Sequence, residues 1–269
     1  MKYLKKIWLW GVAVLLLTSG CEDYFEVSPY SADVRSHMKN THIQHLADIE
    51  EMGSNDSGEF KFAVLNDSHY NYNDLGDAVS IINSRTDIDF VIINGDFADH
   101  GYLKEYEMFY DIVKKLNKPY LTVIGNHDYL TNGGKIYRKM FGEPNKRFIY
   151  NNNLIVLFDN VFWESDIDVD FNWLEESLKN SGQYLNRFVI CHIPPFDGQF
   201  TAETELLYNS LMKNYNVDYS IHGHVHSYSL ADYYNNGVMY LTVESIMDKE
   251  FAVVSVNKED SVAIERIKF

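Results

Sequence analysis

Short apolar runs alternate with amphipathic stretches along this chain, and that alternation constrains the fold more than any other feature of the sequence. From residue 61, runs rich in β-branched and aromatic residues, typical of strands, are separated by stretches with helical periodicity. Such an order indicates βαβ units whose parallel strands are covered by helices on both faces. The expected strands lie at 61–67, 89–95, 119–125, 187–193 and 219–223, and the expected helices at 74–85, 104–117, 171–180 and 201–215.

Three hairpins complete the pattern, with turns expected near Asn152, at Asn236-Gly237 and within 251–269. Two sheets packed face to face, with helices outside, account for this order of elements. The chain has 269 residues, of which 46% are hydrophobic, so it can bury a sizeable core, and its length alone allows one or two domains. Because no linker rich in Pro, Gly or Ser interrupts the chain after residue 60, we expect one domain over residues 61–269.

The N-terminus is typical of a bacterial export signal. Lysines precede an apolar stretch at 7–17, which is shorter than the roughly 20 residues of a membrane-spanning helix. The small residues that follow end at Cys21, and this resembles the lipobox of bacterial lipoproteins, although Thr18 stands where Leu is preferred. We therefore expect a signal peptide at 1–20 and a lipid on Cys21 that anchors the exported chain to a bacterial membrane, in the periplasm or at the cell surface. Ordinary signal cleavage is the alternative.

Residues 21–60 are polar and acidic, and we interpret them as a tether with one helix, for which Thr41 would be the N-cap and Gly53 would follow the last turn. The histidines of this segment have no carboxylate at metal-ligand spacing, so we interpret His37, His42 and His45 as solvated or packed. A lipid on Cys21 would leave Cys191 without a disulfide partner. The formal charge of −16 would repel phosphate backbones and disfavours long nucleic acid as a partner.

Polar residues stand at the ends of five predicted strands, where ligands of open α/β sheets collect. Each has a structural explanation by itself: a turn after glycine, a cap, a core histidine or an exposed strand edge. Together they favour one shared crevice with oxygen and nitrogen ligands. They are Asp67 and His69, Asp96 and Asp99, Asn126 to Asp128, His192, and His224 and His226.

This series resembles the signature of the calcineurin-like metallophosphoesterases. The resemblance covers about residues 61–230, and it implies a four-layer αββα sandwich in which the later hairpins belong to the second sheet. The matching motifs are Asp67-x-His69, Gly95-Asp96-x-x-Asp99, Gly125-Asn126-His127-Asp128, His192 and Gly223-His224-x-His226.

The resemblance implies a pair of divalent metal ions bridged by Asp96. One ion would take Asp67, His69 and His226, and the other would take Asn126, His192 and His224. Two ions about 3.5–4 Å apart can neutralise phosphoryl oxygens and supply a bridging hydroxide as nucleophile. The mixed ligand set suits Mn, Fe, Zn or Ni and includes no thiolate.

The same resemblance gives His127 the role of general acid for the leaving group, with Asp99 holding its imidazole. The expected activity is hydrolysis of a small phosphate ester, either a monoester or a diester. The alternative is a lipoprotein that binds ligands on an inactive phosphoesterase scaffold, since fold alone does not prove activity.

Departures from the known subfamilies narrow the expectation. Protein serine/threonine phosphatases have arginines where this chain has His100 and Ile124, which argues against a phosphoprotein substrate. Purple acid phosphatases have a tyrosine ligand at the place of Asp99, which argues against a charge-transfer iron site. Tyr70, His100 and Tyr129 follow the motifs and either contact substrate or pack in the cleft wall, whereas we interpret His222 and Cys191 as structural. No sequence feature specifies an oligomeric state.

Overall fold

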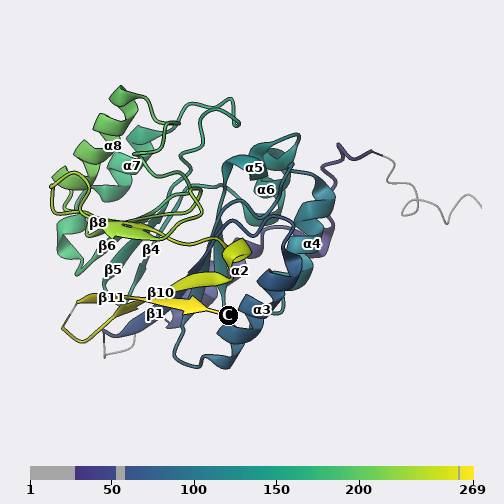
Figure 1. Ribbon diagram of the computed structural model, residues 1–269, viewed down its shortest axis with the longest axis horizontal. Coiled ribbons are helices and arrows are strands. Elements are labelled where there is room, and N and C mark those ends of the chain that lie inside the picture. The colour runs from purple at the N-terminus through teal and green to yellow at the C-terminus, as the bar shows by residue number, and fades with distance from the viewer. Residues whose placement is uncertain (1–27, 53–57, 260) are drawn as a thin grey trace, which may run out of the picture.

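Two β-sheets lie face to face in the computed structural model, which describes residues 28–52, 58–259 and 261–269 (Figure 1). The predicted signal peptide, Cys21 and Gly53 lie outside these described residues. The first sheet has the strand order β11-β10-β1-β2-β3, in which β1, β2 and β3 are parallel and the C-terminal hairpin adds two antiparallel strands. Its strands are β1 (Phe60–Leu65), β2 (Phe90–Asn94), β3 (Tyr120–Val123), β10 (Glu250–Val256) and β11 (Val262–Lys268).

The second sheet has the order β4-β5-β6-β7-β9-β8, with β5, β6, β7 and β9 parallel and an antiparallel strand at each edge. Both sheets are therefore mixed. The strands of this second sheet are β4 (Lys146–Tyr150), β5 (Asn153–Leu157), β6 (Arg187–Ile190), β7 (Tyr219–His222), β8 (Ser229–Ala231) and β9 (Met239–Thr242).

Strand side chains alternate between two cores because successive residues of a strand point to opposite faces. In β1, Phe62 and Val64 join the core between the sheets, whereas Ala63 and Leu65 face the helices. The helices covering the first sheet are α3 (Tyr72–Ser84), α4 (Leu103–Val113) and α6 (Gly133–Phe141), and those covering the second are α7 (Phe171–Leu178) and α8 (Ala202–Asn214). Three apolar cores separate four layers, which confirms the predicted αββα sandwich.

The helix predicted in the tether segment is α2 (Thr41–Met52), and it packs on the sandwich. Ile49 is fully buried in the core between the sheets, and His42 Nε2 accepts the backbone N–H of Thr122 on edge strand β3 at 2.9 Å. Burial lowers the pKa of His42, in agreement with the prediction of a packed histidine. The predicted N-cap is wrong, because Thr41 is already helical and its hydroxyl donates to Met140 O. The domain boundary at 60 and 61 stays a prediction.

The hairpin expectations need two corrections. The C-terminal hairpin of β10 and β11 pairs with β1 in the first sheet, whereas the resemblance had placed the later hairpins in the second sheet. Asn151 and Asn152 both have positive φ in the tight turn between β4 and β5, and β10 pairs with β11. The β8–β9 connection is longer than a two-residue Asn-Gly turn, because pairing starts at Ala231 and Tyr240. Within the described part of the chain, no helix is both long and apolar enough to span a membrane.

Candidate active site

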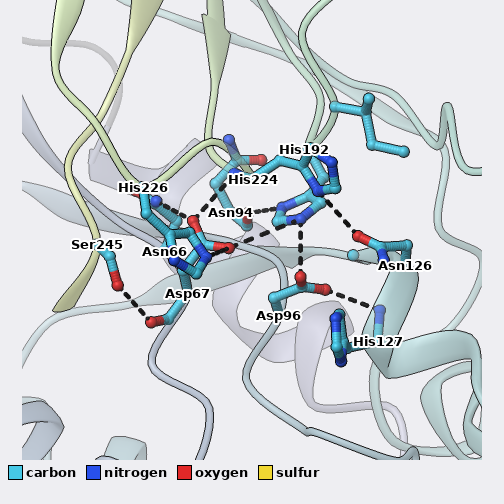
Figure 2. Close-up of polar contacts among 12 residues, drawn as sticks. Asn66, Asp67, Asn94, Asp96, Asn126, His127, His192, His224, His226 and Ser245 are labelled. Atoms are coloured by element: carbon cyan, nitrogen blue, oxygen red, sulfur yellow. Dashed lines mark hydrogen bonds and ion pairs between the residues drawn. The ribbon is translucent and has the colours of Figure 1, made fainter. Parts of the chain in front are cut away.

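The candidate active site lies where strands of both sheets end at their carboxyl termini (Figure 2). The turns after β1, β2 and β3 supply its residues from the first sheet, and the turns after β6 and β7 supply those from the second. The structure therefore brings together every residue that the sequence assigned to metal binding. They are Asp67, His69, Asp96, Asn126, His192, His224 and His226.

The possible ligand atoms form three groups in one cleft, and the third, made of His69, Asp99 and His127, shares His69 with the first. In the first, Asp67, His69 and His226 offer atoms within 4.8 Å of one another, and His226 Nε2 lies 3.2 Å from Asp67 Oδ1. In the second, the same spacing relates Asp96, His192 and His224. The first group has the residues that the resemblance implied for one ion, and the second has His192 and His224 of the other implied set together with Asp96, the implied bridge. His192 Nε2 lies 3.8 Å from Asp67 and 3.1 Å from Asp96.

Asn126 belongs to the second group through its amide oxygen, which lies 3.0 Å from His224 Nδ1. Its amide nitrogen donates to Glu164 Oε1 at 3.3 Å, so the oxygen is directed into the cleft. Asn126 also opens the short helix α5 (Asn126–Tyr129) directly after β3. The rigid strand therefore fixes the amide that follows it.

Buried atoms of the cleft fit a pair of cations. Asp67 Oδ1 and His192 Nε2 are buried and have no hydrogen-bond partner among the described residues, although other site atoms lie 3–4 Å away. Unpartnered buried polar atoms are rare in proteins and need an explanation. Converging carboxylate oxygens and imidazole nitrogens are suitable ligands for Mn, Fe, Zn or Ni. The donor set thus fits the implied metals, and the assignment of each ligand stays a prediction.

The buried side chains of Asp96 and His192 are charged in this site. Burial alone would raise the pKa of Asp96, but the imidazoles around it, His192 foremost, lower it to about 2. Burial alone would lower the pKa of His192, but the carboxylates of Asp96 and Asp67 raise it to about 10. Without a cation, a protonated imidazole balances the carboxylates. Metal binding would displace that proton, since ligating histidine is neutral.

The backbone around the site is held in an uncommon conformation. Asp67, His69, Asp96, His224 and His226 all have φ between 44° and 68°, a region that costs a non-glycine residue about 1–3 kcal/mol. A side chain on Gly125 would lie 2.2 Å from Asp96 Oδ1, so the motif glycine is required by close approach. Such strain clusters where the surrounding structure fixes functional side chains.

Polar contacts connect the two sheets beside the cleft. His192 Nδ1 donates to Asn94 O at 2.7 Å across the sheet interface, which turns Nε2 toward the carboxylates. The backbone N–H of His224 donates to Asp67 Oδ2 at 3.0 Å, and Ser245 Oγ donates to Asp67 O at 2.8 Å. The sequence did not single out Asn94 or Ser245, because their roles depend on contacts distant in sequence.

Asp128 is a further residue whose role the sequence did not indicate. Its carboxylate is fully buried, and burial together with the charge of Asp96 raises its pKa, whereas backbone donors oppose that rise. These donors fix the turn after β2 against the turn after β3. They are the backbone N–H groups of Asp96, Phe97, Ala98 and Gly125. The only sequence signal was its place at a strand end.

The expected pair of Asp99 and His127 needs a correction. His127 Nδ1 lies 2.9 Å from the backbone oxygen of Asp99, and the Asp99 carboxylate instead lies 3.0 Å from His69 Nδ1. The imidazole is still held in one tautomer, because Nδ1–H donates to the carbonyl and leaves Nε2 free. The His69 ring that the carboxylate contacts lies against the His127 ring, with centroids 4.9 Å apart.

Three other residues singled out in the sequence have structural contacts. Tyr129 is 7% exposed and its hydroxyl donates to Asp159. His222 is fully buried, and burial lowers its pKa to about 3, so it is neutral. Cys191 packs in the core under α8, with its sulfur 3.4 Å from His222 Nδ1. The structural interpretation of His222 and Cys191 is confirmed.

Comparison with known proteins found a matching family model and a curated relative. A family model described as calcineurin-like phosphoesterase matches residues 60–228. A curated relative, a probable cyclic nucleotide phosphodiesterase from Xenorhabdus bovienii, is 27% identical over 86 residues, which are 32% of this chain and 33% of that protein. The match thus spans a third of the relative's length.

Solved structures support the fold alone, because their sequence identity is low. A purple acid phosphatase from yellow lupin (Lupinus luteus) seeds has a TM-score of 0.66 at 16% identity and covers 79% of this chain and 52% of its own. The protein GAP50 of Plasmodium, described as the anchor in the inner membrane complex, has a TM-score of 0.59 at 15% identity and covers 78% of this chain and 84% of its own.

Proposed function

The chain belongs to the calcineurin-like phosphoesterase family, and from this premise we propose that it hydrolyses small phosphate esters at a dinuclear metal centre. The observation that carries the proposal is the cleft in which ligand atoms from five strand ends converge without hydrogen-bond partners for Asp67 Oδ1 and His192 Nε2. Divalent ions held there would supply Lewis-acid charge at the phosphoryl oxygens and a nucleophile at neutral pH.

The Asp96 carboxylate is held in a fixed orientation by contacts to both of its oxygens. Asp96 lies between the first and second groups, with Oδ2 3.1 Å from His192 and 4.0 Å from His69, which suits a shared carboxylate. Its other oxygen, Oδ1, accepts the backbone N–H of His127 at 2.9 Å. Rotation of the Asp96 carboxylate is therefore restricted from both sides of the cleft.

His127 is proposed as the general acid. The carbonyl of Asp99 accepts its Nδ1–H, so Nε2 can carry a proton to the leaving alkoxide. His127 is partly exposed beside the buried carboxylates, where a leaving group can reach it. This arrangement separates the charge-binding residues from the proton donor.

The test is a screen of the chain from residue 22, stripped with a chelator and reloaded with Mn²⁺, Zn²⁺, Fe²⁺ or Ni²⁺. We expect metal-dependent hydrolysis of phosphomonoesters, phosphodiesters or both, with cyclic nucleotides included because the curated relative carries that name. Two ions bound per chain without any hydrolysis would instead favour the alternative, a ligand-binding protein on this scaffold.

We also propose that the chain is exported and held at a bacterial membrane by a lipid on Cys21. Support comes from the sequence of residues 1–21, since the described structure begins at residue 28. Stable attachment through acyl chains would need two or more of them.

A further inference from the structure

Tyr70 and His100 present exposed rings at one side of the candidate active site. Tyr70 is 54% exposed and the side chain of His100 is 56% exposed. Each follows a site residue directly, because Tyr70 comes after His69 and His100 comes after Asp99. Two exposed aromatic rings at these places need an explanation, since neither contributes to a core cluster.

The two rings are held in place by a buried carboxylate. The Tyr70 hydroxyl donates to Glu105 Oε1 at 2.9 Å and lies 2.8 Å from His100 Nδ1. Because the hydroxyl proton is used on Glu105, His100 Nδ1 is the donor in the second contact. Glu105 is 5% exposed, and its other oxygen accepts the backbone N–H groups of His100 and Tyr102.

Ring stacking also connects Tyr70 and His100 to the neighbouring ring of Tyr102. The centroids of Tyr70 and His100 are 6.0 Å apart at 28°, and those of His100 and Tyr102 are 5.8 Å apart at 13°. Exposed side chains normally lose rotamer freedom when they bind a ligand. Here that freedom is already restricted, which is the property of a preorganised binding surface.

Tyr70 and His100 directly follow two residues that lie beside His127, the proposed general acid. Asp99 contacts both His69 and His127. Its carboxylate is 3.0 Å from His69 Nδ1, and its carbonyl oxygen accepts a hydrogen bond from His127 Nδ1. The His69 and His127 rings are in edge contact at 4.9 Å. A group leaving toward His127 is therefore close to the residues that immediately follow His69 and Asp99.

We propose that Tyr70 and His100 form a platform that binds a flat ring in the leaving group of the substrate. This inference rests on the proposed phosphoesterase function and specifies its substrate class. The carboxylates of Asp99 and Glu105 lie behind the platform, so a neutral or cationic ring is favoured and an anionic one is repelled. Base–aromatic stacking corresponds to a roughly 5- to 100-fold change in affinity per ring.

The test uses pairs of compounds that differ only in the flatness of a ring. Benzyl and cyclohexylmethyl esters of phosphate, and the corresponding non-hydrolysable phosphonates, have similar size and attachment. With the metal-loaded full chain in detergent, we expect benzylphosphonate to bind more tightly than cyclohexylmethylphosphonate. Tyr70→Ala should weaken benzylphosphonate binding roughly 5- to 100-fold and change binding of the cyclohexyl compound less than about twofold.

Tyr215→Ala is the control. Tyr215 follows α8 at the end away from the cleft, and its hydroxyl also donates to a carboxylate, that of Glu175 in α7. This variant should leave both affinities unchanged. Tyr70→Phe should keep most of the preference for the flat ring, since the stacking face remains. Metal content measured for each variant shows whether both metal ions remain bound.

The outcomes distinguish this inference from the proposed function. Equal losses for both phosphonates in Tyr70→Ala, or no preference in the wild type, would overturn the platform. If the flat phosphonate is preferred but no ester is hydrolysed, the platform stands and the hydrolase proposal fails. If both esters are hydrolysed at equal kcat/KM by wild type and Tyr70→Ala, the hydrolase proposal stands and the platform fails.

Discussion

The floor and the rim of the cleft are built differently. We call Asp67, Asp96 and His192 the floor: they come from both sheets and are at most 2% exposed. We call Asp99, His100, His127 and Tyr70 the rim: they come from turns of the first sheet only and are partly or largely exposed. Floor atoms interact with opposite charges in the buried interior, whereas rim side chains are held at the surface by contacts to Glu105, to His69 or to the carbonyl of Asp99.

This difference indicates which part of the cleft is suited to cation binding and which to contact with substrate. Charges in a low-dielectric interior interact strongly and are costly to leave unpaired, so the floor is suited to binding cations. A proton donor and a ring platform must reach a substrate that enters from solvent, so the rim is suited to them. Substitutions in the floor should therefore reduce metal binding and the turnover of every substrate, and substitutions in the rim should reduce the turnover of only some substrates.

The largest effect is expected for Asp96→Asn. The amide removes the charge proposed to serve both ions, so activity should be lost and occupancy should fall at both metal sites, as measured by elemental analysis and binding titration. Asp111→Asn, on the exposed face of α4, is the control and should change neither. Two ions bound at wild-type affinity in Asp96→Asn would remove Asp96 from the bridge.

His127→Ala should give a large but selective effect. Both ions should remain bound, while turnover of esters with poor leaving groups should fall by ~10²–10⁴, the usual contribution of a positioned acid. An activated aryl ester needs less protonation and should be affected much less. Exposed His37→Ala serves as the control. Equal losses on both kinds of ester would indicate that His127 positions phosphate and does not donate a proton.

Asp128→Asn tests whether stability depends on the backbone hydrogen bonds that Asp128 accepts beneath the floor of the cleft. One carboxylate oxygen becomes an NH₂ donor facing backbone N–H groups, and an unsatisfied buried donor costs about 1–3 kcal/mol. The melting temperature should therefore drop by roughly 2–12 °C, given about 2–4 °C per kcal/mol for a chain near this size. Calorimetry of the metal-loaded protein measures it.

The control for this stability effect is Asp170→Asn. Asp170 caps α7 by accepting the N–H of Trp173, and Asn caps helices about equally well. Its melting temperature should stay close to that of the wild type. A similarly small change for Asp128→Asn would show that the backbone donors find other partners.

The smallest effect on catalysis is expected for Cys21→Ala. Residue 21 precedes the first described residue by several positions and the first floor residue by more than forty, so anchor and cleft should be separable. The variant should leave the membrane fraction, or stall in processing, while the protein from residue 22 keeps its activity. Wild-type chain that takes up no fatty-acid probe would refute the lipid anchor.

Local sequence was sufficient for much of the fold and for the membership of the site. Strand periodicity predicted the two packed sheets, and the polar residues after β1, β2, β3, β6 and β7 predicted one shared crevice, because parallel strands end at the same edge of a sheet. The division of these residues into ligand sets came from the family resemblance. Local patterns did not identify α6, whose opening Gly133-Gly134 pair is typical of a turn. A side chain on Gly133 would lie 1.8 Å from Asp128 O, so that glycine is required by tertiary contact.

Only the tertiary structure decided how the site residues are held. The backbone carbonyl of Asp99 orients His127 and its carboxylate meets His69, an arrangement that spacing along the chain cannot distinguish from the expected one. Asp67 is fixed by the N–H of His224, which is 157 residues away, and Glu105 fixes Tyr70 from a neighbouring helix. The sequence determines which groups reach the strand ends because periodicity is local. Their orientation depends on hydrogen bonds and close approaches between segments that meet only after the two sheets have packed.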